Sequence, residues 1–155
     1  MDSEEQVIAI SSPYGTGKTY TFKQLIPKFN KILFITYRQS LANSLYDELQ
    51  KQRFQNYNEL TNYEIQNAER LIIQLDSLVR LNEKDDITQK KYEPNYDLIV
   101  VDEMEGIFSH FNAKTLKNKQ ITCDILTQLL KETNLIFCLD GDLHNRSLDY
   151  LDNTL

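Results

Sequence analysis

Short apolar runs alternate with amphipathic segments along the chain. Five of these runs are typical of strands buried on both faces: Val7–Ile10, Ile32–Ile35, Leu71–Ile73, Leu98–Val101 and Leu135–Leu139. Between them the apolar positions take a helical spacing, as in Phe22, Leu25, Ile26 and Phe29, in Leu41, Leu45 and Leu49, and in Ile121, Ile125 and Leu129. This alternation predicts an α/β fold in which right-handed crossovers connect the strands of a mostly parallel sheet.

Two polar stretches, residues 53–69 and 82–95, interrupt the alternation. Both are rich in Asn, Gln, Lys and Asp, and we expect them to form long surface loops or partly mobile insertions. Pro27 falls near the end of the first predicted helix, where a break costs little. The sequence shows neither a repeat nor an interdomain linker, and 155 residues suit one domain with a single core.

The segment after the first apolar run reads Ser-Pro-Tyr-Gly-Thr-Gly-Lys-Thr, at residues 12–19. Its glycines allow the backbone N–H groups to approach phosphate oxygens, and the following helix presents its positive end to them. Lys18 would reach the β and γ phosphates of ATP, and Thr19 would bind the Mg²⁺ that accompanies the nucleotide. A match this short also occurs by chance in ordinary loops, but its place between a strand and a helix favours a phosphate-binding loop. The predicted nucleotide-binding residues are Ser12, Gly15, Thr16, Gly17, Lys18 and Thr19.

The fourth apolar run ends in an acid pair, Asp102 and Glu103. Ligands of open α/β sheets bind at such strand ends, so Asp102 is predicted to hold Mg²⁺ and Glu103 to orient or deprotonate the attacking water. Alternatively, both acids cap a helix that begins near Met104. Together with the glycine-rich loop, the pair predicts a P-loop NTPase core: a RecA-like, three-layer sandwich around a mostly parallel sheet of about five or more strands.

Polar residues also follow the second and third apolar runs. Arg38 and Ser40 come after the second run, and Gln74 and Ser77 after the third. Donors at the shared edge of a parallel sheet can bind nucleic-acid phosphates without base specificity. Equally, Thr36 or Ser40 caps a helix and Arg38 meets a surface carboxylate, and these alternatives stay open.

Two further acids, Asp140 and Asp142, have two interpretations, and a third, Asp76, has one. Asp140 and Asp142, which flank Gly141 after the fifth run, either sense the γ-phosphate and couple sites or form a simple turn. Asp76 is a plausible helix cap.

Charge and cysteine usage restrict the function classes. The chain has 17 Lys and Arg against 23 Asp and Glu, a net charge of −6, which is unlike a strong autonomous nucleic-acid binder. Any nucleic-acid contact should therefore be local and weak. The two cysteines, Cys123 and Cys138, show no metal-ligand spacing, which favours a reduced intracellular setting, nucleus or cytoplasm. The acidic start and the absence of a long apolar stretch favour a protein without a secretory signal or membrane partner.

The motifs, taken in order, resemble the first motor lobe of superfamily two helicases. The segments that carry the resemblance are Ser12–Thr19, Ile35–Ala42, Leu71–Leu81, Asp97–Phe111 and Leu139–Leu151. Within them, Gln-Leu-Asp-Ser-Leu-Val-Arg-Leu at 74–81, Val-Asp-Glu-Met-Glu-Gly-Ile at 101–107 and Asp-Gly-Asp-Leu-His-Asn-Arg-Ser at 140–147 are similar to motifs of the herpesvirus replication origin-binding protein family.

The resemblance implies a role for each group of residues. It implies ATP and Mg²⁺ as cofactors, held by Gly15, Gly17, Lys18 and Thr19, with Asp102 and Glu103 serving hydrolysis. Asp140 and Asp142 would couple ATP to DNA, and single-stranded DNA would lie against Arg38, Ser40, Gln74 and Ser77. It also implies that the strand ending at Asp140 is inserted between the strand before the glycine-rich loop and the strand ending at Asp102.

We expect residues 1–155 to form a single N-terminal helicase-like lobe, without the second lobe, its arginine finger or a duplex-binding domain. The leading interpretation is the ATP-binding lobe of a DNA helicase or translocase of the origin-binding type. Its hydrolysis would require a second lobe or a partner chain, and its contact with single-stranded DNA would be weak. One alternative is a nucleotide-binding or interaction module without hydrolysis. A small P-loop phosphotransferase is disfavoured by the acid pair and by the lack of an Arg-rich lid segment.

Overall fold

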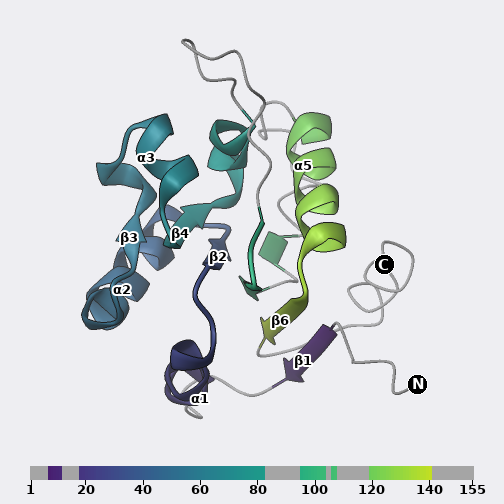
Figure 1. Ribbon diagram of the computed structural model, residues 1–155. Helices are drawn as coiled ribbons and strands as arrows, with labels where there is room; N and C mark the ends of the chain where they lie inside the picture. Colours follow the sequence, from purple (N-terminus) through teal and green to yellow (C-terminus); the bar gives the residue numbers. More distant parts are fainter. Residues whose placement is uncertain (1–6, 12–17, 83–94, 104–105, 108–118, 141–155) are drawn as a thin grey trace.

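The structure is a computed structural model, and it describes residues 7–11, 18–82, 95–103, 106–107 and 119–140 (Figure 1). Six parallel strands form its sheet in the order β1-β6-β5-β2-β4-β3. The strands are β1 Val7–Ser11, β2 Ile32–Thr36, β3 Gln55–Asn56, β4 Arg70–Gln74, β5 Leu98–Asp102 and β6 Leu135–Asp140. The five predicted strands are therefore present, and β6 lies between β1 and β5 as expected.

The described helices are α1 Lys18–Leu25, α2 Gln39–Leu49, α3 Asn62–Asn67 and α5 Lys119–Glu132. Short 3₁₀ segments, η1 Ile26–Lys28, η2 Gln50–Gln52, η3 Tyr57–Glu59 and η4 Leu75–Leu81, connect several elements. Pro27 stands in the first turn of η1, where the missing N–H is tolerated.

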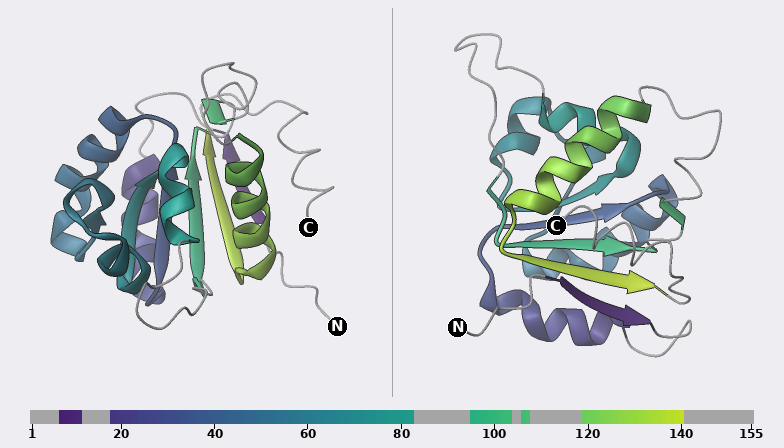
Figure 2. Two further views of the ribbon diagram at one scale, coloured as in Figure 1. Left: turned by 90° about the horizontal axis from the view of Figure 1, so that it is seen from above. Right: turned by 90° about the vertical axis from the view of Figure 1, so that its right-hand side faces the viewer.

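Helices cover both faces of the sheet, which gives the predicted three-layer sandwich. On one face, Phe22 of α1 packs edge-on against Phe34 of β2, with ring centroids 5.2 Å apart. Helix α2 lies beside α1, because Glu48 of α2 approaches Lys23 of α1 to 3.9 Å. On the opposite face, α5 and η4 pack against each other (Figures 1 and 2). This α/β fold confirms the predicted class.

The core is made by strands that are apolar on both faces. Every side chain of β2 is buried, and so are the apolar positions of β4 and β5 and Cys138 of β6. Strand β1 differs from the prediction, since Ile8 is 37% exposed. The reason is its place in the sheet: β1 stands at one end of the described strand order, paired with β6.

The expectation of loops at residues 53–69 is wrong. This segment forms β3, η3 and α3, and it buries Phe54, Tyr57 and Ile65. A capping box opens α3: the Thr61 hydroxyl accepts from the Glu64 N–H at 3.3 Å, and the Glu64 carboxylate accepts from the Thr61 N–H at 2.7 Å. The other predicted loop falls largely outside the described residues.

The helical stripe predicted for α5 differs from the structure at its first position. Ile125 and Leu129 are buried as expected, whereas Ile121 is 50% exposed and Thr122 is fully buried in its place. Among the described residues, no helix is long and apolar enough to cross a membrane.

Candidate nucleotide and nucleic-acid site

Three strands end at one edge of the sheet, and two of them, β5 and β6, carry residues of the predicted nucleotide site there. In the parallel register, Ser11 of β1 pairs with Asp140 of β6, and Asp102 of β5 pairs with Leu139 of β6. The C-terminal ends of β1, β6 and β5 therefore stand side by side (Figure 2). Ser11 ends β1 at this edge, which is where open α/β sheets bind their ligands.

The predicted site residues divide into two groups. Lys18 and Thr19 open α1, Asp102 and Glu103 stand at the end of β5, and Asp140 is the last residue of β6. Ser12, Gly15, Thr16, Gly17 and Asp142 lie outside the described residues. Within the described part of the chain, no group of three or more His, Cys, Asp and Glu side chains could hold a metal ion.

Glu103 has an unusual backbone conformation. Its φ is 53°, in the left-handed region that costs a non-glycine residue about 1 kcal/mol or more. Two hydrogen bonds hold it there: its N–H donates to the Leu139 carbonyl at 2.7 Å, and its carbonyl accepts from the Ile107 N–H at 3.2 Å. The turn that fixes Glu103 is therefore tied both to β6 and to the helical residues that follow. Outliers of this kind cluster at functional sites.

The side chain of Glu103 interacts with Tyr37, which follows β2. Burial raises the pKa of the Tyr37 hydroxyl, and the charge and hydrogen bonding of Glu103 raise it further, while Arg38 lowers it. The Arg38 guanidinium lies over the Tyr37 ring, 4.8 Å from its centroid. Sequence reasoning missed Tyr37. The only available signal was an aromatic residue between a strand end and a candidate phosphate ligand.

The start of α2 answers the capping question raised by the sequence. Arg38 occupies the N-cap position, and no side chain caps the helix within this described element. The buried Thr36 hydroxyl instead donates to the Arg38 carbonyl at 3.2 Å. Arg38 and Ser40 are both exposed at the same edge of the sheet as the acid pair, so their side chains are accessible to a ligand.

Gln74, at the end of β4, is engaged by the protein at both ends of its amide. Its Oε1 accepts from the Tyr57 hydroxyl at 2.8 Å, and its Nε2 donates to the Tyr37 carbonyl at 3.3 Å. Burial raises the pKa of Tyr57, and hydrogen bonding to Ser77 lowers it. The two DNA ligands predicted after the third apolar run, Gln74 at the end of β4 and Ser77 in η4, are both half-buried near Tyr57. They share one network with Tyr37, a connection that residue spacing did not reveal.

Arg80 of η4 stabilises that network through the backbone around Tyr57. Its guanidinium donates to the carbonyls of Leu60 at 2.6 Å and Tyr57 at 3.2 Å, and to the Asn62 side chain at 2.6 Å. Charged donors of this kind are strong, so the segment that carries Tyr57 is held firmly against η4.

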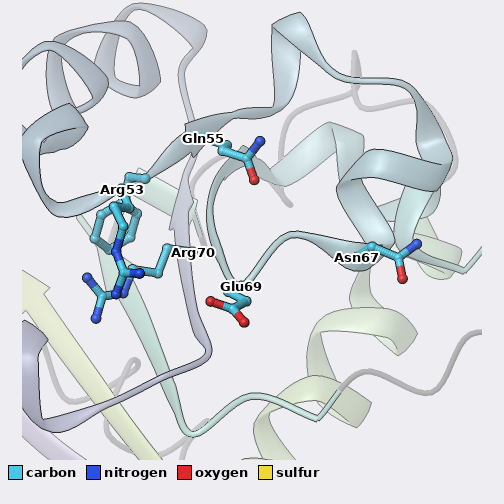
Figure 3. Close-up of a pocket in the computed structure, with 6 residues that line it drawn as sticks. Arg53, Gln55, Asn67, Glu69 and Arg70 are labelled. Carbon is cyan, nitrogen blue, oxygen red and sulfur yellow. The ribbon is translucent and has the colours of Figure 1, made fainter.

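A pocket of about 560 Å³ opens at the opposite end of the sheet, where β3 and β4 begin. It is lined by Arg53, Phe54, Gln55, Asn67, Glu69 and Arg70. Figure 3 shows the Arg53 and Arg70 side chains close to each other. Arg70 already donates to the carbonyls of Gln52 at 2.7 Å and Phe29 at 3.1 Å, so it satisfies the carbonyls at the ends of two helical segments, η2 and η1. We assign this pocket a structural role.

Comparison with solved structures defines the class of the fold. The chain is similar to the DUF1998 helicase MrfA in its crystal structure with DNA and AMPPNP, with a TM-score of 0.60 and 15% identity. The match covers 97% of this chain and 24% of MrfA. A second structure of MrfA matches with a TM-score of 0.55. At this identity the likeness shows the fold alone, which is that of a domain found in helicases.

The family follows from the sequence match. The family model described as "Origin of replication binding protein" matches residues 1–153, so the chain belongs to that family, as its motifs predicted. It is 32% identical to a protein of Acanthamoeba polyphaga mimivirus that bears the name helicase R8 and is itself uncharacterized, over 96% of this chain. It is 27% identical to the replication origin-binding protein of human herpesvirus 6B, over 91% of this chain. The chain spans 14% and 17% of the length of these two relatives.

Proposed function

We propose that this chain is the ATP-binding lobe of a DNA helicase or translocase of the replication origin-binding type. The observation that carries the proposal is the adjacency of β1, β6 and β5 at one edge of the sheet. That edge carries the acid pair Asp102 and Glu103, the end of β6 at Asp140 and the end of β1 at Ser11, and the next described element in the sequence is α1, which opens with Lys18 and Thr19. Membership of the origin-binding family supports the same function.

The proposed division of labour follows the chemistry of each group. The loop from Gly15 to Thr19 binds the phosphates of ATP, and the Thr19 hydroxyl and the half-buried Asp102 carboxylate supply oxygen ligands to Mg²⁺. Glu103 orients the attacking water. Asp140, the last residue of β6, would couple the bound nucleotide to DNA.

Single-stranded DNA is proposed to cross the edge formed by β2 and β4. Arg38 and Ser40 are the exposed members of the predicted set, and they supply the phosphate contacts. Gln74 and Ser77 are half-buried and bonded within the protein, so they support this surface more than they bind the strand directly. Affinity should be weak, because the net charge is −6.

Hydrolysis is proposed to need an arginine from a second lobe or a partner chain. Such an arginine is worth about 10³ to 10⁵ in rate for NTPases. The relatives are several times longer than this chain and have room for such a lobe. If turnover is negligible while binding is intact, the chain acts in isolation as a nucleotide-binding module.

A thermal-shift titration with Mg²⁺-ATP tests the nucleotide site. A ligand that binds only the folded state adds about 2.7 kcal/mol at a hundredfold excess over its dissociation constant, which is roughly 5 to 10 °C for a chain of this size. Lys18→Ala should abolish most of the shift. Lys131→Ala, an exposed lysine in the last turn of α5, is the matched control and should retain it. Equal shifts in wild type and Lys18→Ala would contradict the assignment of the loop.

Turnover measured with and without single-stranded DNA separates the competing functions. A DNA-stimulated rate supports the helicase lobe, and phosphate transfer to an acceptor would indicate a phosphotransferase. A chain that binds ATP without hydrolysing it, and that regains turnover when the remainder of a relative's motor is added, would support the requirement for a second lobe.

A further inference from the structure

Tyr37 joins the proposed nucleic-acid contact to the proposed hydrolytic residue. We propose that Tyr37 is a positioning residue whose hydroxyl holds the Glu103 carboxylate. When a DNA phosphate binds Arg38, the ring of Tyr37 transmits this binding to Glu103 through that hydrogen bond. The inference rests on the function proposed above and adds to it a route by which the two ligands sense each other. Three independent sets of contacts support it.

The first set places the Tyr37 ring against the turn that carries Glu103. A Cβ built on Gly106 would lie 2.6 Å from Cε1 of Tyr37 and 2.9 Å from Cδ1 and Cζ. The ring therefore occupies the space that any larger residue at position 106 would need. Ile107, the next residue, donates to the Glu103 carbonyl at 3.2 Å. Movement of the ring thus acts on the same turn that holds Glu103 in its left-handed conformation.

The second set fixes the backbone at Tyr37 and Arg38. Gln74 Nε2 donates to the Tyr37 carbonyl at 3.3 Å, and Gln74 is itself held by the Tyr57 hydroxyl at 2.8 Å. The next carbonyl, that of Arg38, accepts from the Thr36 hydroxyl at 3.2 Å. Because the carbonyls of both Tyr37 and Arg38 are hydrogen-bonded, we expect a change at Arg38 to pass through the side chains.

The third set is electrostatic. The Arg38 guanidinium, 4.8 Å from the ring centroid, is attracted by the face of the ring. It also lowers the pKa of the Tyr37 hydroxyl, against the raising effects of burial and of Glu103. A phosphate that binds Arg38 competes with the ring for the same cation. The hydroxyl then loses a neighbouring positive charge, and its hydrogen bond to Glu103 changes with it.

An NMR measurement on the ligand-free chain tests the Tyr37–Glu103 half of the proposal. Tyrosines labelled with ¹³C at Cζ give one resonance each, and the resonance absent from Tyr37→Phe identifies Tyr37. We expect Glu103→Gln to shift this resonance at neutral pH, because the amide removes the charge that faces the hydroxyl. Glu132→Gln, an exposed acid at the end of α5, is the control and should leave it unchanged. An unchanged Tyr37 resonance in Glu103→Gln would overturn the proposal.

The same spectrum, recorded with an oligo(dT) strand, tests the link to Arg38. The strand should shift the Tyr37 resonance in wild type, and Arg38→Ala should abolish that shift. A double-mutant cycle gives an independent measure: Glu103→Gln should change oligo(dT) affinity about two- to fivefold, and Tyr37→Phe, which keeps the ring, should remove that effect. A change below twofold, or one of equal size in the Tyr37→Phe background, contradicts the link.

Failure of this inference differs from failure of the proposed function. A chain that binds Mg²⁺-ATP and oligo(dT), yet whose Tyr37 resonance ignores the strand, overturns the link alone. A chain that binds neither ligand contradicts the proposed function and the link together, even if the ligand-free resonance still responds to Glu103→Gln.

Discussion

Adding one methyl group at Gly106 should disturb the site more than its size suggests. Ordinary carbon contacts lie at about 3.5 to 4.0 Å, whereas the new methyl of Gly106→Ala would meet the Tyr37 ring at 2.6 to 2.9 Å. The ring must therefore retreat by about 1 Å. The backbone of Tyr37 cannot follow this movement freely, because the Gln74 side chain donates to the Tyr37 carbonyl.

The magnitude is a balance of two terms. Overpacking of this kind costs about 1 to 3 kcal/mol, and replacing a helical glycine by alanine returns up to about 1 kcal/mol. The net loss in the free energy of unfolding should be about 1 to 2 kcal/mol, or roughly 2 to 8 °C in the melting temperature. Urea titrations measure it.

A double-mutant cycle pairs Gly106→Ala with Tyr37→Ala, which removes the ring. In that background Gly106→Ala should be neutral or stabilising, so the two substitutions should be non-additive by about 1 to 3 kcal/mol. An equal loss of stability in both backgrounds would show that the Tyr37 ring is not what opposes a side chain at Gly106.

Three further outcomes are expected. Glu103→Gln should leave Mg²⁺-ATP affinity nearly unchanged and remove residual turnover, whereas Asp102→Ala should weaken the Mg²⁺-dependent part of binding; calorimetry and a single-turnover assay separate these effects. Anisotropy titrations of single-stranded DNA should give a slope of log K against log salt of about −1 to −2, and Arg38→Ala should reduce it by up to about one unit on every sequence; a strong base preference would contradict a phosphate contact. Thr61→Ala should cost about 1 kcal/mol in urea unfolding. Hydrogen bonds from the Thr61 backbone N–H and from its hydroxyl lower the pKa of Glu64, so the stability that the Glu64 carboxylate contributes is present above the ordinary value of 4.5 and is lost as the pH falls through the lower folded value; stability unaffected by acid in this range would count against it.

Apolar runs predicted the sheet well because a strand buried on both faces needs little context. Ile32–Ile35 and Leu98–Val101 are apolar at each position, and both lie at the centre of the sheet. The amphipathic helices were harder to predict. In α5 the buried Thr122 replaces Ile121, because packing against η4, and not hydrophobicity alone, determines which face turns inward.

The segment 53–69 was misread because its buried residues are few and irregularly spaced. Phe54, Tyr57 and Ile65 lie among Asn, Gln and Glu, so neither a period of two nor one of 3.6 stands out. The capping box of Thr61 and Glu64 was the readable signal. In the site, residue types and strand ends located Asp102, Glu103 and Arg38. Tyr37 could not be found in this way, because its importance lies in contacts with Gly106 and Gln74 that are distant in the sequence.

The position of β6 in the sheet also has a consequence for biosynthesis. Strand β1 is made first, but the strand it pairs with, Leu135–Asp140, follows more than a hundred residues later. At a synthesis rate of about 5 to 20 residues per second, β1 waits on the order of 6 to 25 s for that strand to be made. During this time β2, β4 and β5 can already assemble, since their pairings need no later residues. The edge that is proposed to bind nucleotide is therefore completed after β2, β4 and β5, and a chain that ends before Leu135 would lack the described strand with which β1 pairs, so β1 would be open to association with other chains.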